Sequence, residues 1–144
     1  MKCYMGDTGL LLSHTFSEKE IQDEELYKKL LNDKLSINKG MFFENLIAQM
    51  LVANGYELFF YTHYSSEKHR NDMEMDFLLS NGSKTNFKVN PIEVKSSKNY
   101  STTSFDAFKE KYKKRIGASY VIHPKNFRVE NEVTYLPVYM TYLL

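Results

Sequence analysis

Two stretches of the chain carry acidic residues in a pattern that suits binding of a metal ion and a phosphate. Asp76 lies within the stretch 73–79, and Glu93-Val94-Lys95 forms a Glu-x-Lys pattern. Oxygen ligands from two carboxylates suit a hard divalent cation such as Mg²⁺, which keeps several waters and binds substrate phosphate. A lysine two residues after the glutamate can orient a metal-bound water and offset charge on the phosphate. Asp76, Glu93 and Lys95 are therefore the candidates for metal-assisted hydrolysis of a phosphodiester.

Both stretches read as β-strands in which alternation separates acidic from apolar side chains. The pattern predicts that Glu74 and Asp76 lie on the face opposite Met75, Phe77 and Leu79, and that Glu93 and Lys95 lie opposite Ile92 and Val94. If the two strands pair, Asp76, Glu93 and Lys95 converge at one spot. A tight turn at Asn81-Gly82 would instead set Asp76 opposite Phe87. The convergence therefore requires a longer loop around Ser83 to Asn86 or a bend at Asn90-Pro91. The competing interpretation is a ladder of surface salt bridges across a hairpin.

A helix is expected from about Asn38 to Asn54-Gly55, where glycine can adopt the left-handed conformation that ends helices. On a helical wheel, Asn45 and Gln49 point away from one broad apolar arc. This arc contains Phe43, Leu46, Ile47, Met50 and Leu51. Glu44 falls at the edge of this arc. Its two interpretations are an acid in the first helical turn, favoured by the helix dipole, and a residue that supports the metal site.

The remaining segments predict an α/β or α+β protein with a mixed central sheet flanked by helices. The expected elements are a strand over 2–5, a helix from the capping box Ser17–Glu20 to about Asn32, a strand over 57–64, a charged loop over 65–72, a helix from 101–104 to Gly117, a strand over 118–122, and a tail over 133–144 that reads either as a strand or as a short helix opened by Pro137.

Composition excludes several classes of protein. The 144 residues carry a formal net charge of +1, so no overall basic field marks a nucleic-acid binder. One cysteine excludes a disulfide framework and a multi-cysteine zinc site. No apolar run approaches the length of a membrane span, and no signal peptide opens the chain, so we expect a cytoplasmic protein without membrane contact. The basic run Lys109–Arg115 is either a solvated helix face or a surface for phosphate contacts.

Four sequence blocks, in the same order along the chain, resemble a known family. Gly40–Gln49 resembles its G-x-x-F-E-N-L-x-A-Q helix, Glu74–Leu79 its E-I-D-F-L-L strand and Pro91–Ser96 its P-I-E-V-K-S strand, while Asp7–Leu11 matches its opening D-T-G-L-L. The family is the C-terminal domain of unknown function of prokaryotic AAA+ family ATPases, within the PD-(D/E)xK nuclease-like superfamily. The proline of the superfamily name is replaced here by Met75, before Asp76.

The resemblance implies a restriction-endonuclease-like three-layer core and a Mg²⁺- or Mn²⁺-dependent DNA endonuclease. It implies that Asp76, Glu93 and the Val94 carbonyl hold the metal, that Lys95 acts on the water, and that Glu44 supports the cluster. It further implies that residues 1–144 form one nuclease-like domain, the C-terminal part of a longer ATPase. The chain contains no G-x-x-x-x-G-K-[ST] motif, so the AAA+ motor would lie elsewhere in the polypeptide or act in trans.

Two other functions are compatible with the sequence. The first is a catalytically inactive restriction-endonuclease-like module for protein interaction or nucleic-acid binding, which the near-zero net charge favours. The second is a protein-interaction domain without a metal, which requires the acidic residues to lie on separate faces.

Overall fold

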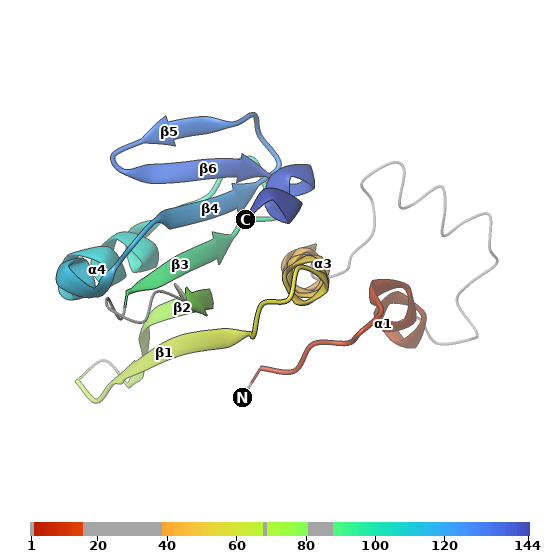
Figure 1. The fold of residues 1–144 in the computed structure, drawn as a ribbon. Helices are drawn as coiled ribbons and strands as arrows, with labels where there is room; N and C mark the ends of the chain where they lie inside the picture. Colours follow the sequence, from red (N-terminus) through yellow and green to blue (C-terminus); the bar gives the residue numbers. More distant parts are fainter. Residues whose placement is uncertain (1, 16–38, 68, 81–87) are drawn as a thin grey trace.

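Six strands form one mixed sheet in the order β1-β2-β3-β4-β6-β5, with helices on both faces (Figure 1). The structure is a computed structural model and describes residues 2–15, 39–67, 69–80 and 88–144. Its elements are α1 (Thr8–Thr15), α3 (Lys39–Ala53), β1 (Phe59–Ser65), β2 (Arg70–Ser80), β3 (Val89–Val94), α4 (Thr103–Tyr112), the 3-10 helix η1 (Lys113–Arg115), β4 (Ser119–His123), β5 (Arg128–Glu130), β6 (Val133–Pro137) and the 3-10 helix η2 (Val138–Leu143).

The predicted mixed α/β sheet is confirmed, and its direction changes at β3. Strands β1, β2 and β3 are antiparallel neighbours, whereas β3, β4 and β6 run parallel. The connection from β3 to β4 passes through α4, as parallel strands require a crossover. The carboxyl ends of β3 and β4 therefore meet at one edge of the sheet.

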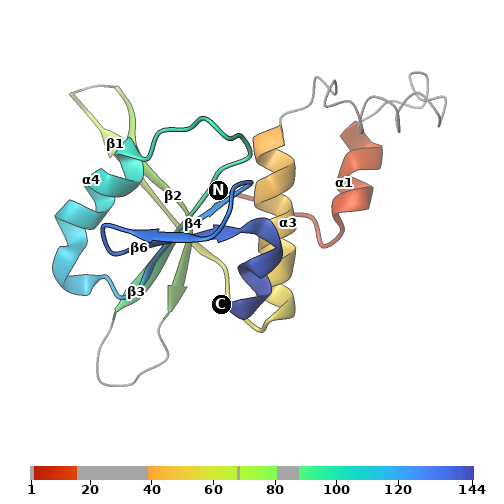
Figure 2. The same cartoon turned by 90° about the horizontal axis from the view of Figure 1, so that it is seen from above.

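Helix α4 covers one face of the sheet, and α3 with η2 covers the other (Figure 2). Two clusters of buried side chains follow from this arrangement. The cluster under α4 includes Met75, Phe105, Phe108, Val121 and Val133. The cluster under α3 includes Ile47, Leu51, Phe77, Ile92 and Ile122. Because successive strand residues point to opposite faces, neighbours such as Val121 and Ile122 are both fully buried.

A bulge in β2 changes the predicted alternation next to Asp76. Phe59 of β1 pairs with Leu78, but Tyr61 pairs with Met75, so β2 carries one extra residue over this stretch. An extra residue in one strand reverses the face on which the following side chains lie. Met75 consequently belongs to the cluster under α4, whereas Phe77 packs under α3. The prediction of a single apolar face is therefore wrong for the set Met75, Phe77 and Leu79.

Helix α3 ends as predicted. Gly55 has a φ of 85°, in the left-handed region. The Gly55 N–H donates to the Val52 carbonyl at 2.9 Å, and the Tyr56 N–H donates to the Leu51 carbonyl at 3.0 Å. These two bonds form the Schellman motif that satisfies the last carbonyls of a helix.

The buried face of α3 differs from the predicted arc. Asn45 is only 2% exposed, whereas Leu46 is 37% exposed. The reason is a second layer outside α3, because the N-terminal segment and α1 pack against its far side (Figures 1 and 2). Asn45 therefore faces protein where the wheel expected solvent.

Residues 2–5 form no strand, contrary to the prediction. Their polar backbone groups bind side chains of α3, since the Met5 N–H donates to Asn45 Oδ1 at 2.8 Å. Helix α1, which was not predicted, begins directly after Asp7. The Asp7 Oδ1 accepts the Leu10 N–H at 2.7 Å, the hydrogen bond of a helix N-cap. The helix predicted from Ser17 to Asn32 lies outside the described residues.

Boundaries also differ from the predictions elsewhere in the chain. The charged loop is shorter than 65–72, because β2 begins at Arg70. The helix predicted to reach Gly117 ends at Tyr112 and tightens into η1, which ends at Arg115. After η1, the Gly117 N–H donates to the Val89 carbonyl at 2.9 Å, before β4 begins at Ser119. The tail contains both predicted alternatives, first β6 and then η2.

Strand β5 was not predicted because its hairpin turn lacks glycine. Asn131 and Glu132 connect β5 to β6 with φ values of 51° and 60°. A two-residue turn with both φ angles positive is commonly marked by Asn-Gly, which is absent here. Among the described residues, no helix has both the length and the apolar composition needed to cross a bilayer.

Candidate functional site

The candidate site lies where β2 and β3 separate. The hydrogen-bonded ladder of the two strands runs from the pair Ser80–Val89 to the pair Phe77–Ile92. Residues 81–88 therefore connect the strands, in place of a two-residue turn, and Asp76 lies one position beyond the last pair. The Val94 N–H donates to Asp76 Oδ2 at 2.8 Å, so an acidic side chain takes the place of a backbone partner at the end of the ladder.

Glu93 and Lys95 form an ion pair on β3 and the residue that follows it. The Lys95 Nζ lies 2.6 Å from Glu93 Oε1. Strand alternation brings the two side chains to one side, as predicted. The other carboxylate oxygen, Glu93 Oε2, is buried and has no hydrogen-bond partner among the residues that the structure describes. A buried carboxylate oxygen without a partner is costly, so it needs a proton or a cation.

The environment of Glu93 favours its protonated form. Burial, followed by the negative charge of Asp76, raises the pKa of Glu93 from 4.5 to about 7. The hydrogen bond and the charge of Lys95 act in the opposite direction. Asp76 is therefore close enough for its negative charge to disfavour ionisation of Glu93.

Asp76 and Glu44 share a lysine that sequence reasoning did not identify. The Lys2 Nζ lies 2.8 Å from Glu44 Oε1 and 3.0 Å from Asp76 Oδ1. It also lies 3.1 Å from Glu74 Oε1. Tyr4 adds a hydrogen bond from its hydroxyl to Glu44 Oε1. Glu44, Glu74 and Asp76 thus converge on one ammonium group.

These contacts alter the acidity of the groups involved. Burial, followed by the charge of Glu44, raises the pKa of Asp76, although the Val94 N–H and Lys2 oppose the change. Burial lowers the pKa of Lys2, but the hydrogen bonds and charges of Glu44 and Asp76 outweigh it and raise that pKa overall. Lys2 is therefore fully protonated and carries the compensating charge of the cluster.

Glu44 and Glu74 both lie beside Lys2, at positions that differ from simple expectations. Glu44 does not lie in the first turn of α3, because the helix begins at Lys39 and has no acidic residue there. The dipole interpretation of Glu44 is therefore wrong. Glu74, predicted to lie on the same face as Asp76, is half exposed and shares the contact with Lys2.

The F-E-N-L-x-A-Q block of α3 also holds the N-terminal segment. Asn45 Nδ2 donates to the Met5 carbonyl at 3.2 Å and to Thr8 Oγ1 at 3.0 Å. Gln49 donates to the Gly6 carbonyl and accepts a hydrogen bond from Thr8. The polar residues of this block thus bind backbone and side chains across the sequence, which explains why they interrupt an apolar helix.

A cation at this site would draw on few protein ligands. Among the described residues, no group of three or more His, Cys, Asp or Glu side chains is arranged to hold a metal. Mg²⁺ needs fewer, because it binds through one or two carboxylates and keeps several waters. The Val94 carbonyl points to the same side of its extended strand as the Val94 N–H, which faces Asp76. Asp76, Glu93 and Val94 thus present only hard oxygen donors, the type that Mg²⁺ and Mn²⁺ prefer.

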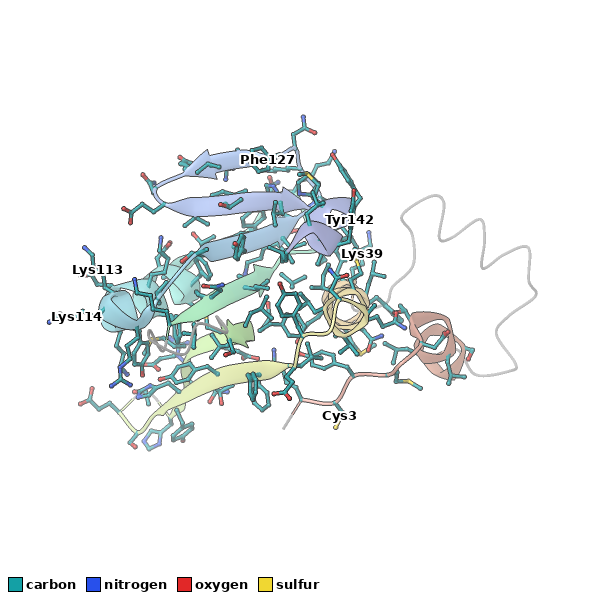
Figure 3. All side chains as sticks on the ribbon, viewed as in Figure 1. Cys3, Lys39, Lys113, Lys114, Phe127 and Tyr142 are labelled. Atoms are coloured by element: carbon teal, nitrogen blue, oxygen red, sulfur yellow. The ribbon has the colours of Figure 1, made fainter. Side chains whose placement is uncertain are left out.

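The basic run lies away from this cluster. Lys113 and Lys114 point outward beside α4, across the molecule from Cys3, the neighbour of Lys2 (Figure 3). The run therefore forms a solvated surface, and any phosphate that it contacts is remote from the acidic residues.

Comparison with known proteins gives one match. Neither a curated protein nor a solved structure matches the chain. A domain of unknown function (DUF4143) matches residues 39–141, which include Glu44, Asp76 and Glu93 but not Lys2. The chain therefore belongs to the DUF4143 family.

Proposed function

We propose that the domain is a Mg²⁺- or Mn²⁺-dependent nuclease that hydrolyses phosphodiester bonds of DNA on a restriction-endonuclease-like core. The single observation that carries this proposal is Glu93 Oε2, a buried carboxylate oxygen without a partner among the described residues, within electrostatic reach of Asp76. A cation bound there would stabilise both carboxylates at once.

Charge balance supports the choice of a divalent cation. The cluster contains the four carboxyl groups of Glu44, Glu74, Asp76 and Glu93, and the two ammonium groups of Lys2 and Lys95. With every group ionised, four negative and two positive charges leave a net charge of −2. A divalent ion offsets more of this negative charge than a monovalent ion does, whether or not Lys2 stays in the cluster.

Each residue has a distinct role in this proposal. Asp76, Glu93 and the Val94 carbonyl hold the metal, which supplies Lewis-acid stabilisation of the attacked phosphate. Lys95, held beside Glu93 at 2.6 Å, orients the attacking water and offsets charge that develops on the phosphate. Glu44 is a positioning residue, because its contacts are with Lys2 and Tyr4.

Association with an AAA+ ATPase motor, in the same polypeptide or in trans, is part of the proposal and rests on the resemblance of the four sequence blocks. The second candidate function is a catalytically inactive restriction-endonuclease-like module for protein interaction or nucleic-acid binding. One observation favours it, since Lys2 already compensates Glu44, Glu74 and Asp76 without a metal.

Two measurements on the purified chain test the proposal. The first is calorimetric titration with Mn²⁺, and the second is nicking of supercoiled plasmid DNA with Mg²⁺ or Mn²⁺. Lys95→Met should reduce cleavage by about 100-fold with little change in metal affinity, because lysine stabilises developing charge without being a ligand. Glu93→Gln should reduce both cleavage and metal affinity, because it removes a metal ligand.

Lys88→Met is the matched control, since Lys88 is exposed beside the opposite end of β3. It should leave both measurements unchanged. Metal binding without cleavage under any condition would favour the inactive module. Absence of both metal binding and cleavage would contradict the nuclease proposal.

A further inference from the structure

The N-terminal strap, residues 2–8, is hydrogen-bonded along α3 by side chains of that helix. Asn45, which is almost fully buried, binds the N–H and the carbonyl of Met5 as well as the hydroxyl of Thr8. Gln49 binds the Gly6 carbonyl and Thr8. The middle of the strap is therefore fixed, and Lys2 extends from it toward β2.

Lys2 inserts a positive charge among the acidic side chains. Its Nζ contacts Glu44 at 2.8 Å, Asp76 at 3.0 Å and Glu74 at 3.1 Å, and its side chain is only 18% exposed. Three carboxylates therefore surround one ammonium group at hydrogen-bonding distances. The charge of Lys2 also acts on Glu93, whose side chain is 9% exposed and whose Oε2 lacks a partner among the described residues.

Both oxygens of Asp76 are engaged when the strap is in place. Oδ2 accepts the Val94 N–H at 2.8 Å, and this backbone group is fixed by β3. Oδ1 accepts Lys2 at 3.0 Å, and a lysine side chain can rotate away. Oδ1 is thus the oxygen that becomes available to a metal when Lys2 leaves.

We propose that Lys2 occupies the cation position beside Asp76, so that the N-terminal strap and a divalent metal compete for Asp76 Oδ1. This inference rests on the proposed metal site and adds a means of regulating it. A metal and an ammonium group that share a carboxylate repel each other, so binding of one disfavours the other. A cavity of about 350 Å³ beside the cluster, lined by Lys2, Cys3, Tyr4, Glu44 and Glu74 among others, gives the displaced ammonium group room to move.

Calorimetric titration with Mn²⁺ tests the competition in the full chain. Lys2→Met should raise Mn²⁺ affinity about tenfold if the strap occupies the cation position about nine-tenths of the time. Lys88→Met, the matched loss of a positive charge outside the cluster, should leave the affinity unchanged. A general electrostatic effect would move both variants alike and would overturn the proposal.

Hydrogen exchange of the wild-type chain gives a second readout that does not depend on a variant. Saturating Mg²⁺ should speed exchange of the Met5 amide, which is bound to Asn45, because release of Lys2 loosens the strap. The amides of β4 should remain as protected as before. Unchanged exchange of Met5 under saturating Mg²⁺ would overturn the proposal.

The outcomes separate this inference from the proposed function. If the wild type binds the metal and Lys2→Met binds it with no higher affinity, the proposed competition is wrong and the proposed metal site still stands. Binding by Lys2→Met alone supports both. No binding by either protein, with Lys2→Met shown to be folded by circular dichroism, overturns both.

Discussion

Replacing Glu93 by glutamine is expected to change how the stability of the fold depends on pH. Glu93 is buried beside Asp76, and its pKa in the folded chain is about 7 compared with an ordinary value of 4.5. Glutamine keeps the size of the side chain and removes its titration. The comparison of the two proteins therefore isolates the contribution of one carboxyl group.

The sign follows from the raised pKa. Below pH 4.5 the group is protonated in both the folded and the unfolded chain, and its contribution to stability is fully present. As the pH rises from 4.5 to about 7, the unfolded chain loses the proton more readily than the folded chain, and stability falls. The difference of about 2.5 pH units, at about 1.4 kcal/mol for each unit, corresponds to a total loss of about 3 to 4 kcal/mol. The Glu93→Gln variant should not show this loss.

Urea titrations at half-unit intervals from pH 4 to pH 8.5 measure the effect as the free energy of unfolding. The difference between wild type and Glu93→Gln should grow by about 3 kcal/mol across this range, whatever its constant offset from the lost ion pair to Lys95. Glu110→Gln, on the exposed face of α4, is the control and should run parallel to the wild type. Parallel curves for wild type and Glu93→Gln would refute the assignment of a buried, protonated carboxyl group.

Two further predictions concern stability and use the same urea titration. Asn45→Leu should cost about 1–3 kcal/mol, because it leaves the Met5 N–H without its buried partner, and no loss would show that the strap is not fixed by this residue. Gly55→Ala should cost about 1 kcal/mol, because Gly55 has a φ of 85°, whereas Gly6→Ala, with open space around its added Cβ, should cost less.

Local sequence patterns predicted the parts of the site that depend on near neighbours. The contact between Glu93 and Lys95 follows from strand alternation, and the end of α3 at Gly55 follows from the conformational freedom of glycine. Both features involve residues within a few positions of one another. Backbone sterics fix the geometry of both features, and these steric preferences follow from the residue types in the local sequence.

The order of the strands and helices was also largely predictable, but their faces were not. The bulge before Leu78 places Met75 and Phe77 under different helices, which regular alternation cannot anticipate. Asn45 is buried because the strap and α1 form an additional layer over α3. A helical wheel contains no information on a layer contributed by a distant segment.

Only the tertiary structure revealed the cation among the acidic residues. Lys2 and Asp76 are 74 positions apart, and neither periodicity nor spacing relates them. Their contact depends on the strap packing against α3 and on the burial that makes an uncompensated carboxylate costly. The sequence by itself therefore determined which acidic residues lie on the two neighbouring strands β2 and β3, while the packing of distant segments decided which charges compensate them.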